Sequence, residues 1–171
     1  MSKKIRHEKH GESRERLYII WSNMKARCSN PKSAFYLYYG GRGISVCEEW
    51  AQSYLAFRSW ALSNGYQDNL KIDRRDNDGN YEPGNCRWAT HSQQMQNTRK
   101  RSDAKTSRFR GVSLHSQNKN WVVQGFRDGR PVYVGSYDTE KEAAIAYDAW
   151  AIKNYGEFAS LNFKEHGGAL R

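Results

Sequence analysis

A polar, basic stretch at residues 97–108 is the feature that most limits how this chain can fold. It contains five Lys and Arg residues against one acid, and it has no periodic run of apolar residues that a core could bury. We therefore predict a linker at residues 99–106 between two small modules. The chain has 171 residues, of which 13% are aromatic, and this is enough for two compact cores.

The excess of Lys and Arg, 28 against 18 Asp and Glu, gives a formal net charge of +10. This balance favours a polyanionic partner, because each cation that meets a phosphate releases condensed counterions. No apolar run approaches the roughly 20 residues that span a bilayer. The first 16 residues also lack the apolar segment of a secretory signal. We therefore expect no contact with membranes. Three cysteines, too few for a disulfide framework, favour the reducing cytoplasm. The lack of clear dimer signals in the sequence favours a monomer.

The first module is predicted at residues 13–98, after a polar tail at residues 1–12. It should open with a helix that ends near residue 28, because apolar residues recur there at helical spacing. These residues are Leu17, Ile20, Trp21 and Met24. An aromatic, glycine-rich stretch at residues 36–44 indicates a tight loop, and a second helix is expected over residues 48–63.

Residues 71–97 predict a strand, a loop, a second strand and a helix. Lys71–Arg74 is short and strand-like, turn-forming residues follow it, and Cys86–Ala89 suits a returning strand. Thr90–Gln93 matches a capping box, so a helix should begin there. A strand and a helix that crosses it can each offer an oxygen ligand to a hard divalent cation, which would neutralise a scissile phosphate. Asp73 and Gln94 occupy these two places.

These segments resemble the ββα-metal motif of phage-type HNH homing endonucleases. The residues that carry the resemblance are Lys71-Ile72-Asp73-Arg74, Asn85-Cys86-Arg87-Trp88-Ala89-Thr90 and Gln94. The resemblance implies that Asp73 and Gln94 bind one Mg²⁺ or Mn²⁺ ion and that Asn85 fixes the loop. It also implies the cytosol of a phage-infected or bacterial host as the location.

The first module departs from that family at the general base. Arg74 stands where the family carries a His, and Arg cannot deprotonate water near neutral pH. His91, one turn before Gln94, is one candidate for the base, and Tyr38 and Tyr39 are others. If none of them serves, the metal ion alone activates the water. The alternative to an enzyme is a non-catalytic DNA-binding regulator that carries a degenerate HNH module.

The three cysteines Cys28, Cys47 and Cys86 are too few for a disulfide framework. Together with His91 they would offer three sulfurs and one nitrogen to zinc. No C-x-x-C knuckle is present, however, so we favour three small buried hydrophobic side chains over a zinc site.

The second module is predicted at residues 107–163, before a tail at residues 164–171. Three strands are expected at 109–114, 121–127 and 131–137, with a hairpin turn at Asp128-Gly129. Thr139–Glu142 forms a capping box that opens an Ala-rich helix reaching Asn154. Ser107–Val112, Trp121–Val123, Tyr133–Thr139, Glu142–Ala144, Ala146–Asp148 and Leu161–Phe163 resemble the AP2 domain.

That resemblance implies a three-stranded antiparallel sheet packed on one helix, whose outer face enters the major groove of double-stranded DNA. The residues expected to meet DNA are Arg110, Ser113, His115, Gln124, Phe126 and Tyr133. Several positions that are Arg in plant AP2 domains are Ser113, His115 and Phe126 here, which puts the plant target sequence in doubt. Further phosphate contacts are expected from Arg42, Arg87, Arg99, Lys100 and Arg101.

The sequence thus predicts an α+β chain with an HNH ββα-metal nuclease module followed by an AP2-like sheet and helix. The predicted function is a sequence-directed, divalent-metal-dependent DNA endonuclease. The alternative is the non-catalytic AP2-type DNA-binding regulator.

Overall fold

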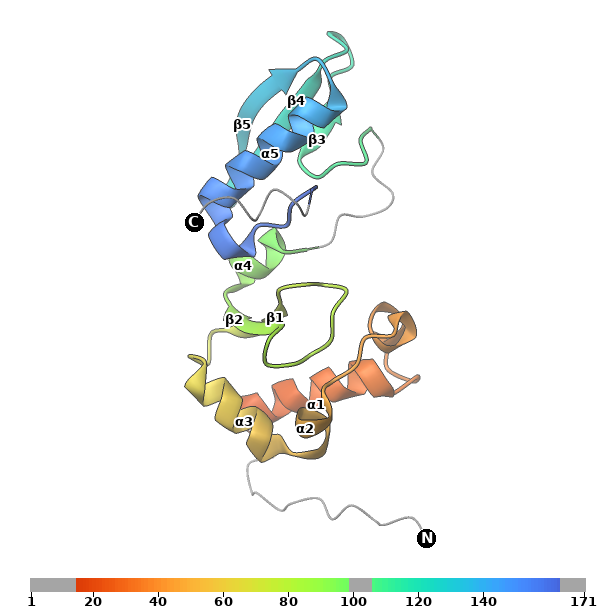
Figure 1. Cartoon of the computed structure of the whole chain (residues 1–171), viewed down its shortest axis with the longest axis vertical. Coiled ribbons are helices and arrows are strands. Elements are labelled where there is room, and N and C mark those ends of the chain that lie inside the picture. The colour runs from red at the N-terminus through yellow and green to blue at the C-terminus, as the bar shows by residue number, and fades with distance from the viewer. Residues whose placement is uncertain (1–14, 99–105, 164–171) are drawn as a thin grey trace. The chain divides into compact units, whose positions relative to one another are not determined.

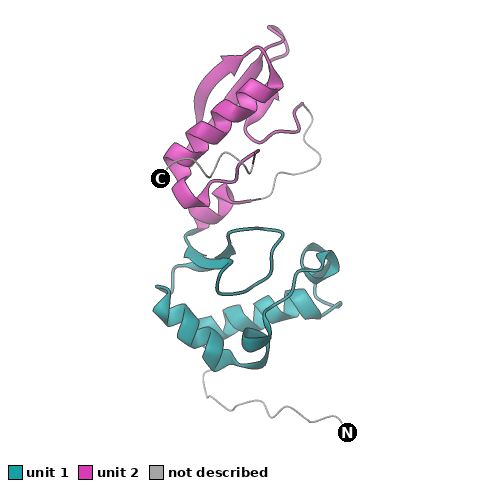
Figure 2. Cartoon of the chain, in the orientation of Figure 1, with its two compact units in different colours: residues 1–90 teal, residues 91–171 magenta. Residues whose placement is uncertain are grey.

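The computed structural model describes residues 15–98 and 106–163. Its elements are α+β, and the chain divides into two compact units, Met1–Thr90 and His91–Arg171 (Figure 2). We call them unit 1 and unit 2. Their boundary lies eight residues before the predicted end of the first module, because the helix that follows Thr90 packs within unit 2.

Unit 1 begins with helix α1, Arg16–Ser29, whose buried stripe is Leu17, Trp21 and Met24 as the helical spacing predicts. Two short 3-10 helices follow, η1 at Tyr36–Tyr38 and η2 at Gly40–Arg42, and they lie at the C-terminal end of α1 (Figure 1). Helices α2, Glu48–Gln52, and α3, Tyr54–Ser63, complete the helical part.

The single helix predicted over residues 48–63 is wrong, because Ser53 interrupts it. Ser53 has extended backbone angles, and its Oγ accepts a hydrogen bond from the backbone N–H of Ala56 at 3.3 Å. It is therefore the N-cap of α3. A serine at this position favours a new helix start over continuation of the first helix.

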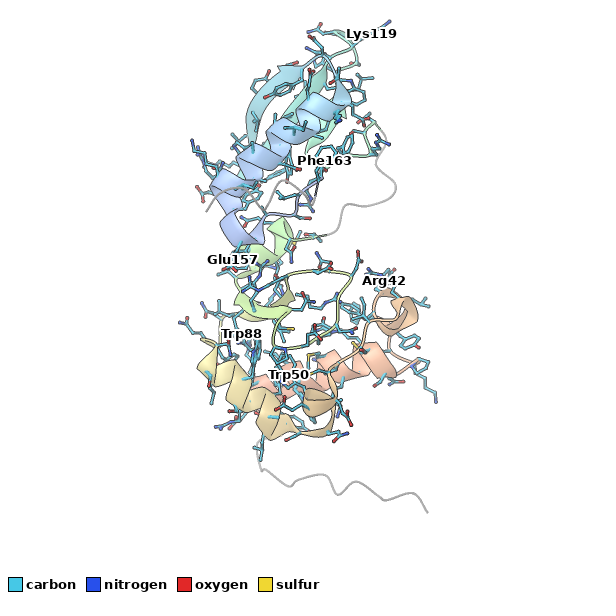
Figure 3. All side chains as sticks on the ribbon, in the orientation of Figure 1. Arg42, Trp50, Trp88, Lys119, Glu157 and Phe163 are labelled. Carbon is cyan, nitrogen blue, oxygen red and sulfur yellow. The ribbon has the colours of Figure 1, made fainter. Side chains whose placement is uncertain are left out.

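A two-stranded antiparallel sheet closes unit 1. Strand β1, Lys71–Arg74, pairs with β2, Cys86–Ala89, so that Ile72 faces Trp88 and Asp73 faces Arg87. Trp50 and Trp88 both lie inside this unit, and Trp60 contacts both indole rings (Figure 3). The core of unit 1 is thus largely aromatic.

Unit 2 contains helix α4, His91–Gln96, which begins where the sequence predicted it. A three-stranded antiparallel sheet follows in the order β3-β4-β5. The strands are β3 at Val112–Leu114, β4 at Trp121–Arg127 and β5 at Arg130–Tyr137. Helix α5, Glu140–Tyr155, lies across one face of this sheet, and the short helix η3, Gly156–Phe158, follows it directly (Figure 1).

The local signals of unit 2 are confirmed at two places. Asp128 and Gly129 both adopt positive φ, 54° and 74°, as a two-residue hairpin turn requires. Thr139 and Glu142 form the complete reciprocal capping box at the start of α5. The first strand was predicted too early, at residue 109, because Gly111 has φ +70° and turns the chain before β3 begins.

Helix α5 approaches the sheet closely because two glycines make room for its aromatic side chains. A Cβ atom added to Gly125 would lie 2.1 Å from the ring of Trp150, and one added to Gly111 would lie 2.0 Å from the ring of Tyr147. The fully buried alanines of α5, Ala143, Ala144 and Ala151, complete the contact with the sheet.

We predict that Gly125→Ala lowers the free energy of unfolding by about 1–3 kcal/mol, since Trp150 must leave its place on β4. Urea denaturation followed by tryptophan fluorescence measures the change. Gly84→Ala is the control, because nothing lies within 4 Å of its added Cβ. Equal stability of the two variants would contradict the close approach of α5.

Candidate nucleic-acid interface

The sheet of unit 2 has one face turned away from α5. On β4, Val123 and Gly125 are buried toward the helix, whereas Gln124 and Phe126 are exposed. Because neighbouring residues of a strand point to opposite faces, Gln124 and Phe126 belong to the outer face. Opposite Gln124, Tyr133 is 64% exposed, and Phe126 itself is 59% exposed.

A bulge in β5 fixes which residues meet on this outer face. Val123 pairs with Gly135, but the next residue, Gln124, pairs with Tyr133, so Val134 is the extra residue. Bulges of this kind re-aim side chains at functional edges of sheets. Ser113 lies opposite Val122, which in turn faces Ser136, and this row extends the outer face across all three strands.

His115 and Arg110 lie at the margins of the predicted interface. His115 is exposed just beyond β3, and its Nδ1 accepts a hydrogen bond from the backbone N–H of Asn118. Arg110 is half-buried, and its guanidinium donates to the carbonyls of Gln96, at 3.1 Å, and Thr98. Arg110 therefore ties the end of α4 to unit 2, and its contact with DNA stays a prediction.

In unit 1 the predicted metal ligand Asp73 is buried, with an exposed fraction of 8%. Its Oδ2 accepts a hydrogen bond from Nε of Arg87 at 3.0 Å, and the Arg87 side chain is equally buried. A carboxylate already paired with a guanidinium does not favour a divalent cation beside it. The other predicted ligand, Gln94, lies on α4 in unit 2 together with His91, so the expected Mg²⁺ or Mn²⁺ site stays a prediction.

The side chain of Asn85 forms hydrogen bonds with the backbone of the loop between β1 and β2. Its Oδ1 accepts from the backbone N–H of Asp76 at 2.8 Å, and its Nδ2 donates to the carbonyls of Asp76 and Asn80. The side chain thus joins the two ends of the loop.

Arg74 lies against two tyrosines and is buried. Its Nη1 donates to the carbonyl of Gly79 at 2.7 Å, and its guanidinium carbon lies 5.1 Å from the ring centroid of Tyr39 and 4.7 Å from that of Tyr81. Burial raises the pKa of Tyr81, against the opposing effect of Arg27 and Arg74. Through these contacts, Arg74 packs at the edge of the hydrophobic core of unit 1 and has a structural role there.

Arg42 projects from η2 at the surface of unit 1 (Figure 3). Its guanidinium forms an ion pair with Asp78 and donates to the carbonyl of Tyr38 at 3.2 Å. The predicted phosphate contacts Arg99, Lys100 and Arg101 lie outside the described residues.

The cysteines are free thiols. Burial raises the pKa of the Cys86 thiol to about 12, and it also raises the pKa values of Cys28 and Cys47. Within residues 15–98 and 106–163, no group of three or more His, Cys, Asp or Glu side chains could hold a metal ion.

Most of the net positive charge of the chain lies outside residues 15–98 and 106–163. Residues 15–98 carry ten Lys and Arg against eight acids, and residues 106–163 carry seven against six. The segment 99–105 alone carries four cations and one acid. Across the parts of the chain that the structure describes, no helix has the length and apolar character that membrane crossing needs.

The family model of the AP2 domain matches residues 107–157. The chain is 36% identical over 72 residues to the AP2-like ethylene-responsive transcription factor TOE2 of Arabidopsis thaliana. It is 38% identical over 66 residues to APETALA2-like protein 2 of Oryza sativa subsp. indica. These matches cover 42% and 39% of this chain, and the chain spans about 15% of the length of each relative.

The comparisons overturn the predicted endonuclease. Another relative, 41% identical over 59 residues (33% of this chain, 14% of that protein), is the Ethylene-responsive transcription factor WRI1 of Arabidopsis thaliana. Relatives that are named as plant transcription factors are not hydrolases and do not come from phages. The predictions of an enzyme, of an HNH nuclease and of a phage origin are therefore wrong. The predicted endonuclease activity was the basis for the catalytic roles given to Asp73, Arg74, Asn85, Gln94, His91 and Tyr39.

Because Asp73 and Arg87 are buried together, we predict that Asp73→Ala destabilises the chain by about 3–5 kcal/mol, since it leaves the guanidinium without its carboxylate. Urea denaturation measures the loss. The double variant Asp73→Leu/Arg87→Met should recover most of it. As a control, Asp78→Ala breaks the exposed pair with Arg42 and should cost less than about 1 kcal/mol. Equal effects of Asp73→Ala and Asp78→Ala would contradict the importance of the buried pair.

Proposed function

We propose that the chain is a sequence-directed, non-catalytic DNA-binding regulator whose contact with double-stranded DNA is the outer face of the β3-β4-β5 sheet. The observation that carries the proposal is the one-sided sheet. Helix α5 covers one face, while Gln124, Phe126 and Tyr133 stand exposed on the other. The AP2 match over residues 107–157 and the transcription factors among the relatives support it.

The chemistry of this face suits a groove of DNA. A small antiparallel sheet fits the major groove, where each base pair shows a distinct pattern of donors and acceptors. The amide of Gln124 can both donate to and accept from an adenine edge, and the exposed ring of Phe126 can contact a thymine methyl group. The row from Ser113 to Ser136 adds small polar groups that can lie close to the bases or the backbone.

The first experiment is selection of bound sequences from a random duplex pool by the full chain. We expect an enriched sequence, because the exposed face offers side chains that read base edges. A pool without enrichment would contradict sequence-directed binding.

The second experiment tests the face itself on the selected duplex. Gln124→Ala should weaken binding by about 1–3 kcal/mol, and the loss should concentrate at one or two base pairs of a single-base variant panel. Ile145→Ala is the matched control, because Ile145 is 38% exposed on α5, on the other side of the unit. A uniform loss across the panel would mean that Gln124 reads no base, and an effect of Ile145→Ala alone would move the interface to the helix.

A further inference from the structure

The segment 16–47 of unit 1 contains five Lys and Arg residues and neither Asp nor Glu, although the whole chain has 18 acids. It forms α1 and the turn that holds η1 and η2. This segment therefore carries a formal charge of +5, whereas residues 15–98 as a whole carry ten Lys and Arg against eight acids.

Three apolar side chains stand in solvent at the turn of this segment. Phe35, Leu37 and Tyr38 have exposed fractions of 63%, 76% and 66%, the largest among the bulky hydrophobic side chains described in unit 1. We call residues 35–38 the tip. Apolar groups gathered on a surface in this way mark a binding site more often than scattered ones do.

Packing behind the tip holds these side chains outward. A Cβ added to Gly40 would lie 2.1 Å from the carbonyl oxygen of Cys28, so the turn is pressed against the end of α1. Tyr39 points inward and stacks on Tyr81, with 6.3 Å between ring centroids. Because Tyr39 and Gly40 are fixed from behind, the exposure of Leu37 and Tyr38 is a feature of the fold.

Two cations lie close to the tip: Arg27 packs on Tyr39, which follows the tip, and Lys32 precedes the tip in the sequence. The guanidinium carbon of Arg27 lies 4.8 Å and 4.9 Å from the ring centroids of Tyr39 and Tyr81, and its Nε is buried without a hydrogen-bond partner. Lys32 is exposed three residues before Phe35. Among the residues that the structure describes, no carboxylate pairs with Arg27 or Lys32, whereas Arg42 of the same segment pairs with Asp78.

We propose that the tip, with Arg27 and Lys32, is a second contact surface for double-stranded DNA. The apolar side chains pack into the minor groove and the cations contact the phosphates on either side. Proteins that bind this groove insert apolar side chains and place Lys or Arg beside them. The absence of acids over residues 16–47 favours a polyanion over a protein partner. This inference rests on the proposed function, because it adds a second contact to the same DNA.

The test compares variants of the full chain on a fluorescein-labelled duplex of mixed sequence, with affinity measured by anisotropy. Leu37→Ser/Tyr38→Ser should weaken binding about tenfold, as loss of an aromatic contact with bases does. Leu55→Ser/Leu62→Ser is the matched control, because these two leucines are 45% and 53% exposed on α3. It should leave the affinity unchanged.

The cations are tested by salt dependence. Lys32→Gln should reduce the slope of log affinity against log salt by about 0.9, the value for one phosphate contact. Arg27→Lys, which keeps the charge on the tyrosines but removes the planar fork, should weaken binding and leave the slope nearly unchanged.

The outcomes separate this inference from the proposed function. If the tip variant and Lys32→Gln bind like the wild type while Gln124→Ala weakens binding to the selected duplex, the inference is overturned and the function of the sheet stands. Equal losses for the tip variant and the α3 control also overturn it. If the wild type binds no duplex, both proposals fail.

Discussion

The close approach of α5 to the sheet determines which side chains of unit 2 are exposed to solvent. Trp150 occupies the place where a side chain of residue 125 would stand, and Tyr147 does the same at residue 111. With one face of β4 filled in this way, the side chains that alternate with Val123 and Gly125 must point to solvent. The exposure of Gln124 on the outer face therefore follows from the packing of α5 on the opposite face of β4.

The same unit shows which parts of a fold a sequence can predict. The hairpin at Asp128-Gly129 and the capping box at Thr139 were predictable, because each depends on residues that are neighbours in the chain. The start of β3 was not, since the positive φ of Gly111 accompanies a close contact with Tyr147, 36 residues away. The assignment of α4 to unit 2 was likewise hidden, because Arg110 binds the carbonyls of Gln96 and Thr98 across a basic segment that resembles a linker.

The wrong prediction of a nuclease also has a physical explanation. The strand, loop, strand and helix predicted over residues 71–97 are present, and Asn85 does close the loop. Asp73, however, faces Arg87 across the β1–β2 pair and satisfies it in a buried ion pair. A carboxylate and an amide, which could bind a metal ion, can equally well stabilise a fold by pairing with an arginine or with the backbone. The pattern therefore predicted local structure well and chemistry poorly.

Most of the net charge and the exposed face of the sheet belong to different parts of this chain. This separation has consequences for binding. The described units carry 17 cations against 14 acids, so most of the net charge of +10 lies in residues 1–14, 99–105 and 164–171. Cations of this kind give salt-dependent attraction that does not distinguish sequences. The outer face of the sheet, by contrast, offers the uncharged side chains of Ser113, Gln124 and Tyr133. In the proposed function, phosphate contacts hold the protein on the duplex and neutral groups read it. High salt should then weaken binding to every duplex while it leaves the ranking of sequences largely intact.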